Sequence, residues 1–170
     1  MPPFSSKYAA QYVEPVITNL IRIIKRDMAE VFALPDVNKG DALPVFVEVI
    51  GVRKNEPHYN YCVVQARTTA TDRSNTPISV DEQHLINVFI GVRSANELLA
   101  DKLMYRYVRG TDQIISSAKK DDIFEGVLTK ETRAGLRCDV VAHNYGQVGY
   151  DSTNYTFLAS LGLDIREMEK

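Results

Sequence analysis

The feature that most constrains the fold is a strand that runs almost directly into a capped helix near the middle of the chain. Residues 85–92 (LINVFIGV) form an apolar run rich in β-branched and aromatic residues, which is typical of a buried strand. Ser94 and Glu97 follow with the three-residue spacing of a capping box, which predicts a helix from Ala95 with Ser94 as its N-cap. A strand and a helix joined this closely indicate an α/β or α+β domain.

An amphipathic helix is predicted over residues 13–32, with Pro15 in its first turn. It would be about 30 Å long at 1.5 Å per residue. Its polar side carries charges of both signs, which favours a helix packed on a protein core over one that lies on a membrane surface. The apolar positions recur at three- and four-residue spacing: Val13, Val16, Ile17, Leu20, Ile21, Ile24, Met28, Val31 and Phe32.

The remaining periodic segments predict strands. Residues 44–52 and 59–69 are expected to form an antiparallel hairpin, and residues 123–132 and 136–143 to form two strands around Arg133–Gly135. Residues 155–166 are expected to form the last strand. Residues 95–117 continue the central helix, which Gly110 could kink or divide. Two long polar segments, 71–82 and 144–154, are predicted to be loops.

These elements predict one α+β domain over residues 1–170, with residues 1–12 as an irregular N-terminal arm. The expected order is α-β-β-β-α-β-β-β, with a mixed or antiparallel sheet packed by two main helices. The net charge of −2 argues against a dedicated nucleic-acid-binding protein. The chain has no signal-peptide pattern and no apolar run of membrane-spanning length, so we expect a soluble protein made inside the cell.

The sequence offers few residues for catalysis or metal binding. His58, His84 and His143 have none of the short spacings that bring metal ligands together. Cys62 and Cys138 are expected to be free, buried thiols. Cys138 and His143 are five residues apart on one predicted strand, so their side chains should point to opposite faces unless a bulge intervenes. We therefore predict no catalytic residue, no cofactor and no metal site.

The predicted loops are the best candidates for contacts with other molecules. Tyr145, Tyr150 and Tyr155 cluster in or beside the second loop, and Arg73 lies in the first. Tyrosine is favoured at protein interfaces because it combines a large apolar ring with a polar hydroxyl. We therefore predict an interface that includes these four residues; the alternative is that the tyrosines pack on their own domain.

The element order resembles that of the tail-terminator, or tail-completion, proteins found at the head–tail junction of tailed phages. The segments that carry the resemblance are the helix 13–32 followed by PVFVEVIGV (44–52), then INVFIGV (86–92) running into SANELLADKL (94–103), then YTFLASLGLDIRE (155–167). The resemblance covers most of the chain as a pattern of elements.

This resemblance implies a non-enzymatic virion protein, made in the host cytoplasm, that forms a hexameric ring on the tail tube. Such a ring would stop tube polymerisation and join the tail to neck or connector proteins. DNA could pass through its lumen without specific binding, and no membrane would be involved. Two alternatives stay open: another neck, connector or baseplate adaptor protein, and a small cytoplasmic enzyme or ligand-binding module without a recognisable motif.

Overall fold

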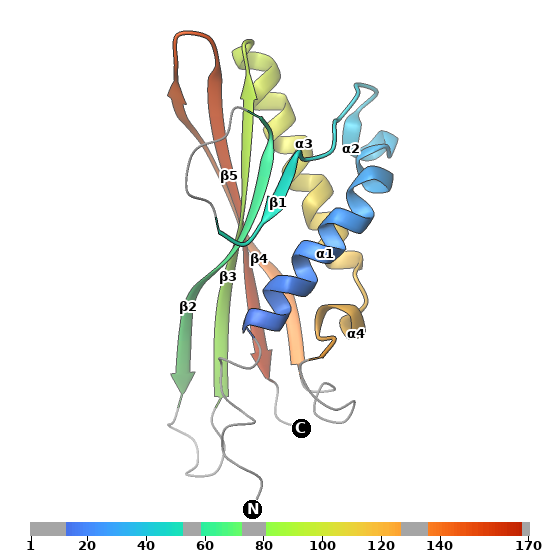
Figure 1. Ribbon diagram of the computed structural model, residues 1–170, viewed down its shortest axis with the longest axis vertical. Coiled ribbons are helices and arrows are strands. Elements are labelled where there is room, and N and C mark those ends of the chain that lie inside the picture. Colours follow the sequence, from blue (N-terminus) through green and yellow to red (C-terminus); the bar gives the residue numbers. More distant parts are fainter. Residues whose placement is uncertain (1–12, 53–58, 73–80, 127–135, 168–170) are drawn as a thin grey trace, which may run out of the picture.

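In the computed structural model, which describes residues 13–52, 59–72, 81–126 and 136–167, two long helices cover one face of a five-stranded sheet (Figure 1). This arrangement confirms the predicted α+β class, with a mixed sheet and two main helices. The elements in chain order are α1 (Val13–Phe32), α2 (Pro35–Asn38), β1 (Glu48–Ile50), β2 (Tyr61–Asp72), β3 (Asp81–Ser94), α3 (Glu97–Ser117), α4 (Lys120–Ile123), β4 (Leu136–Tyr150) and β5 (Tyr155–Glu167).

The strand order in the sheet is β1-β2-β3-β5-β4. The pairs β2–β3, β3–β5 and β5–β4 are antiparallel, and β3 pairs with β5 along nearly its whole length, from Gln83–Arg166 to Ser94–Tyr155. Alternate residues of β3 face the helices, and the fully buried ones are Ile86, Val88, Ile90 and Val92. The apolar run 85–92 is continuous because Leu85 and Phe89 occupy the opposite face.

The predicted antiparallel hairpin over residues 44–52 and 59–69 is wrong. Strand β1 is three residues long and pairs with β2 in parallel, with Glu48 opposite Tyr61 and Ile50 opposite Val63. The chain must therefore return past β1 before β2 begins, because parallel neighbours cannot be joined by a tight turn. The turn residues 55–57 favoured a tight turn, and the antiparallel pairing was inferred from that turn. These residues lie outside the described ones.

The predicted loop over residues 144–154 is also wrong for most of its length. Strand β4 continues through Tyr150, and only residues 151–154 connect it to β5. The Asp151 carboxylate closes this turn, since its Oδ1 accepts from the backbone N–H groups of Thr153 at 3.0 Å and Asn154 at 2.8 Å. Asparagine and glycine have low strand propensity, but pairing with β5 holds them extended. Bulges at Val140/Ala142 and Gln147/Gly149 take up the irregularity.

The predicted strand over residues 123–132 does not begin at Ile123. Ile123 is the last residue of the short helix α4, and Phe124 is buried beside it. Helix α1 holds this segment, because the amide of Asn19 donates to the carbonyls of Ile123 and Glu125, each at 2.9 Å. The remainder of the predicted strand, the predicted arm 1–12 and the centre of the first predicted loop lie outside the described residues.

Helix α3 begins later than predicted and with a different cap. Its N-cap is Asn96, whose side chain accepts from the N–H of Leu99 at 3.1 Å. Ser94 instead accepts from the N–H of Asn96, so the predicted capping box does not form. The helix runs unbroken through Gly110 to Ser117, and no described helix is long and apolar enough to cross a membrane.

An aromatic cluster joins the two long helices to the segment before β1. The rings of Phe32, Phe46 and Tyr107 are all mutually in contact, with centroids 4.8 to 5.4 Å apart. The Tyr107 hydroxyl donates to the carbonyl of Pro44 at 2.7 Å and accepts from the amide of Asn60 at 3.1 Å. Burial raises the pKa of Tyr107 to about 12, so this hydroxyl stays protonated as a donor.

Candidate interaction surfaces

Nine of the ten exposed large hydrophobic side chains of the described residues fall into two groups at opposite edges of the sheet. We call the first group the β1-edge surface, and the second group the β4-edge surface. A tenth side chain, Leu99, lies on the flank of α3 that also carries Arg106, which pairs with Asp41 at 2.9 Å. The β1-edge surface consists of Val45, Val47, Val52 and Tyr59, and the β4-edge surface of Leu98, Tyr105, Val141, Tyr145 and Tyr150.

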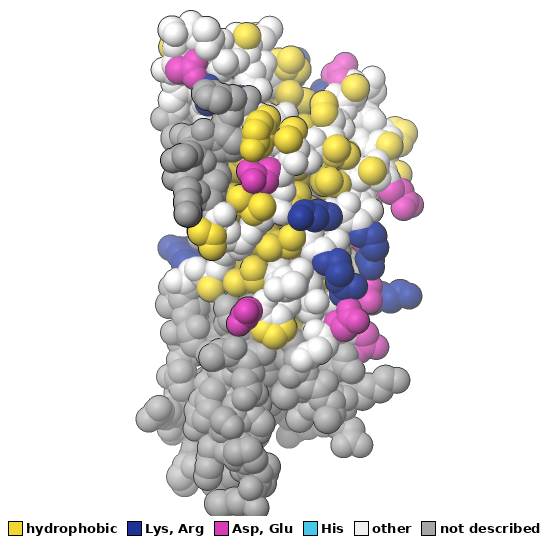
Figure 2. Space-filling model, viewed as in Figure 1, with side chains coloured by type: hydrophobic (Ala, Val, Ile, Leu, Met, Phe, Trp, Pro, Cys, Tyr) yellow, Lys and Arg dark blue, Asp and Glu magenta, His cyan; other side chains and the backbone are white. Residues whose placement is uncertain are grey.

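The β1-edge surface is strongly apolar. Val47 is 69% exposed and Val52 is 77% exposed, although valine is a residue that is usually buried. Figure 2 shows hydrophobic side chains gathered over β1 and the adjoining part of α1. The Tyr59 hydroxyl donates to a carboxylate oxygen of Glu48 at 3.2 Å. Partial desolvation and the Glu48 charge raise the pKa of Tyr59, so the hydroxyl remains a donor.

The aromatic part of the β4-edge surface lies where α3 passes β4. The ring of Tyr105 in α3 meets the ring of Tyr145 in β4, with centroids 5.0 Å apart. Further along the hairpin, Tyr150 and Tyr155 form a directly opposed pair with centroids 4.5 Å apart. Leu98 precedes Tyr105 by seven residues, or about two helical turns, and so lies on the same flank of α3.

A polar chain of three residues anchors this part of β4 to α3. The Nε2 atom of His143 is 3.0 Å from Oδ2 of Asp112, and the hydroxyl of Ser116 donates to Oδ1 of the same carboxylate at 2.7 Å. A Ser-His-Asp triad needs the imidazole between the hydroxyl and the carboxylate. Here the carboxylate lies in the middle, so His143 cannot remove the proton of Ser116 and the arrangement is structural.

Three of the four predicted interface residues come together on the β4–β5 hairpin. Tyr145 and Tyr150 are half-exposed, but they lie in a strand and not in the predicted loop. Tyr155 is partly buried against the core, as the alternative interpretation predicted for all three tyrosines. Arg73 lies outside the described residues. The sequence interpretation missed Tyr105, although its seven-residue spacing from Leu98 on a predicted helix was a usable signal.

Neither cysteine has the setting of a nucleophile. Both are free, as predicted, and burial raises the pKa of Cys62, which is fully buried. Burial and the carboxylates of Asp139 and Asp164 raise the pKa of Cys138 to about 12. The bulge after Val140 places Cys138 and His143 on the same face of β4, which corrects the expectation of opposite faces.

The shared face still does not bring this thiol and imidazole together. The β5 partners of Cys138 and His143 are Ile165 and Leu161, four residues apart, or roughly 13 Å along a strand at 3.3 Å per residue. The Nε2 atom of His143 is also engaged with Asp112. The structure does not describe the side chains of His58 and His84. The residues that it does describe contain no group of three or more potential metal ligands.

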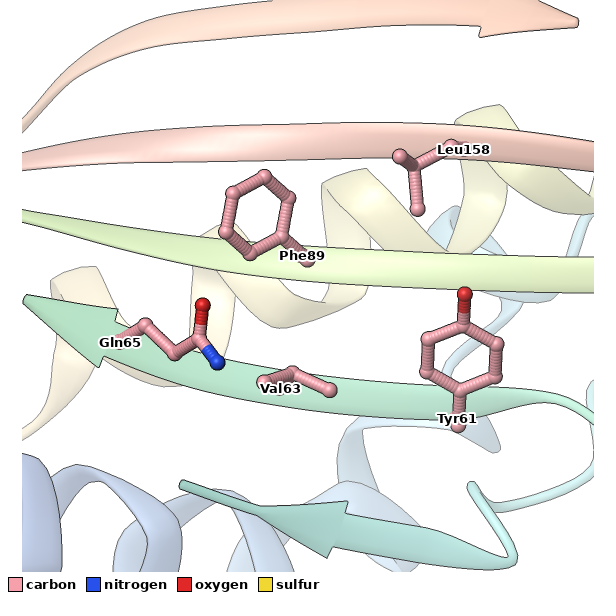
Figure 3. A pocket seen from close by; sticks show the side chains of 5 residues that line it. All are labelled: Tyr61, Val63, Gln65, Phe89 and Leu158. Carbon is pink, nitrogen blue, oxygen red and sulfur yellow. The ribbon is translucent and has the colours of Figure 1, made fainter. Parts of the chain in front are cut away.

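A hollow of about 280 Å³ lies on the sheet face that points away from the helices. Figure 3 shows side chains from β2, β3 and β5 lining it, with the Tyr61 ring reaching from β2 toward β3. The amide of Gln65 and the hydroxyl of Tyr61 are its polar side-chain groups. Such a lining suits a small apolar group but supplies no charge or nucleophile. The lining residues are Tyr61, Val63, Gln65, Phe89 and Leu158.

Comparisons with known proteins assign no role to any of these residues. The chain matches no protein-family model, and a search of curated proteins finds no relative. The two edge surfaces must therefore be interpreted from their own chemistry and from their positions in the sheet.

Proposed function

We propose that this protein is a non-enzymatic structural component that assembles with copies of itself into a ring at the junction between the tail and the head of a tailed phage. The observation that carries the proposal is the pair of exposed apolar surfaces at the two opposite edges of one sheet. Large apolar patches on a soluble protein usually mark interaction sites.

Two different surfaces on one chain favour a particular kind of assembly. A twofold dimer uses one self-complementary surface, whereas a ring or filament joins one surface of each copy to a different surface of the next. The β1-edge and β4-edge surfaces differ in composition, since one is built mainly of valine and the other mainly of tyrosine. They lie at opposite ends of the strand order, so each copy could contact two neighbours.

The position at the tail–head junction is supported by the order of elements along the sequence. Helix α1, the strand–helix joint from β3 into α3, and the terminal strand β5 are formed by the segments that carry the resemblance to tail-terminator proteins. In this role the ring would stop polymerisation of the tail tube on one side and bind neck or connector proteins on the other. Its net charge of −2 suits a lumen through which DNA passes without adhering.

Two other functions make different predictions. A neck, connector or baseplate adaptor would assemble in the same way but occupy another position in the particle. A ligand-binding module is favoured by the hollow beside Phe89, and its function would not require ring assembly. Alkylation of both thiols and addition of chelators should leave ring assembly unchanged, whereas loss of a measured activity after either treatment would favour an enzyme.

The test of the proposal has two stages. Native mass measurement of the purified protein should give six copies or a multiple of six, and electron microscopy should show closed rings. Gold-labelled antibodies should then bind phage particles at the tail–head junction, and loss of the protein should give tails of uncontrolled length without heads. A protein that remains strictly monomeric at high concentration would rule the proposal out.

A further inference from the structure

We infer that the β1-edge surface of one copy packs on the β4-edge surface of the next copy, and that Glu48 at the centre of the first surface pairs with Lys102 and Arg109 beside the second. This inference rests on the proposed self-assembly and goes further by assigning the two surfaces to each other.

Among the described residues, the segment 42–52 that carries most of the β1-edge surface holds a single negative charge. Glu48 is the only charged residue within residues 42–52, and Val47 and Val49 flank it in sequence. Its carboxylate already accepts from the Tyr59 hydroxyl, which holds it next to an exposed ring of the same surface. A carboxylate held in an apolar surface gains most from a cation that arrives together with apolar groups, because burial without a partner is costly.

The β4-edge surface carries the complementary charges. Lys102 lies three residues before Tyr105 and Arg109 four residues after it, so both lie beside that ring on the flank of α3. Both side chains are exposed, and neither has an ion-pair partner among the described residues. The same flank also carries the carboxylates of Asp101 and Asp112, and Asp112 is engaged with His143. Lys102 and Arg109 are therefore the cations beside Tyr105 that an incoming carboxylate can reach.

The geometry makes a second copy the occupant. The two surfaces are separated by the full width of the sheet, so one chain cannot bring them into contact with each other. In two copies placed side by side, the β1 edge of one meets the β4 edge of the other, with Val47 and Val52 against Tyr105. Each copy then uses both surfaces once, and repetition of this contact generates a ring or a filament.

The decisive experiment uses two singly substituted proteins, Val47→Cys and Tyr105→Cys, treated with a short thiol-specific cross-linker. Neither protein alone should form covalent dimers, because each contact would contain only one introduced thiol. Mixed rings, produced by co-expression, should give covalent dimers. Lys25→Cys, an exposed change on α1, serves as the control partner for Val47→Cys and should give none. The parent protein controls for Cys62 and Cys138.

A charge exchange tests the ion pairs. Glu48→Lys alone, or Lys102→Glu with Arg109→Glu, should raise the dissociation constant for self-assembly at least tenfold, and the combined variant should recover most of the loss. Lys25→Glu, an exposed change on α1, should have no effect. Glu48→Gln checks the first result without a reversed charge, and thermal unfolding confirms that each variant is folded.

The outcomes separate this inference from the proposed function. A parent protein that is always monomeric contradicts both. A parent that assembles contradicts only the inference if Val47→Cys cross-links to itself, if the mixed rings do not cross-link, or if the charge exchange has no effect. Cross-linking in mixed rings alone, with recovery in the combined charge variant, is the supporting result.

Discussion

Gly110 in α3 lies directly against the ring of Phe32 in α1. A Cβ atom at Gly110 would lie 2.7 Å from Cε1 of Phe32 and 3.0 Å from Cγ1 of Val37, closer than such carbon atoms approach. Both neighbours are fully buried. The glycine therefore allows the two long helices to pack closely, and this packing carries the aromatic cluster that α1 shares with Phe46 and Tyr107.

Replacing Gly110 by alanine should destabilise the protein despite the better helix propensity of alanine. The propensity gain is about 1 kcal/mol, whereas overpacking a buried site costs about 1 to 3 kcal/mol. We expect a net loss of about 1 kcal/mol in the free energy of unfolding, measured by urea denaturation. Gly146→Ala is the control, because no atom lies within 4 Å of the added methyl group. Equal free energies of unfolding for the two variants would contradict this prediction and would show that the Phe32 ring can shift to accommodate the methyl group.

Gly91 and Tyr61 should behave as a coupled pair across β3 and β2. A Cβ atom at Gly91 would lie 2.1 Å from Cε1 of Tyr61, because the ring lies flat over the glycine. Gly91→Ala should therefore cost about 1 to 3 kcal/mol. In a Tyr61→Val background the ring is absent and the same change should cost much less. A double-mutant cycle measures this coupling, and strictly additive effects would contradict it.

Tyr107→Phe should be destabilising although it removes only one oxygen atom. The hydroxyl joins the carbonyl of Pro44 to the amide of Asn60, and both lose a partner when it is removed. Leaving buried polar groups unsatisfied costs about 1 to 3 kcal/mol. Tyr59→Phe, which removes an exposed hydroxyl from Glu48, should change the free energy of unfolding far less. Similar losses in the two variants would argue against a buried network.

Asp151 should make stability depend on pH in the acid range. The hydroxyl and backbone N–H of Thr153 and the N–H of Asn154 hold the pKa of this carboxyl well below its usual value, with a smaller contribution from Arg93. Because the pKa of Asp151 is lower in the folded state than in the unfolded state, its carboxylate stabilises the fold. This stabilisation is complete above the unfolded-state pKa of about 4 and is lost as the pH falls below that value.

The free energy of unfolding should therefore fall between about pH 5 and pH 2, with a shallower slope in Asp151→Asn. Urea denaturation at several pH values measures both slopes. Thr153→Ala should give an intermediate slope, because it keeps the two backbone donors and loses the hydroxyl. Parallel slopes for the parent and Asp151→Asn would show that Asp151 does not contribute.

The periodic segments of the sequence predicted the helices and strands correctly where the spacing of apolar residues along the chain decides which side chains are buried. Helix α1 begins and ends where its apolar spacing indicated, and β5 covers the predicted terminal strand. The errors occur where a distant partner decides the conformation. Residues 144–150 have the composition of a loop, but β5 supplies a hydrogen-bonding template for them. Three tyrosines were predicted at an interface, yet Tyr105, their neighbour from α3, lies forty residues before Tyr145 and was missed.

By itself the sequence determined the α+β class, the two main helices, the free thiols and a central strand that feeds a helix. These follow from periodicity and composition, which act over a few residues. Only the tertiary structure decided that β1 pairs in parallel, that β5 lies between β3 and β4, and that exposed apolar side chains collect at the two edges of the sheet. Strand order and edge exposure depend on which distant segments pair, and no local pattern encodes that choice.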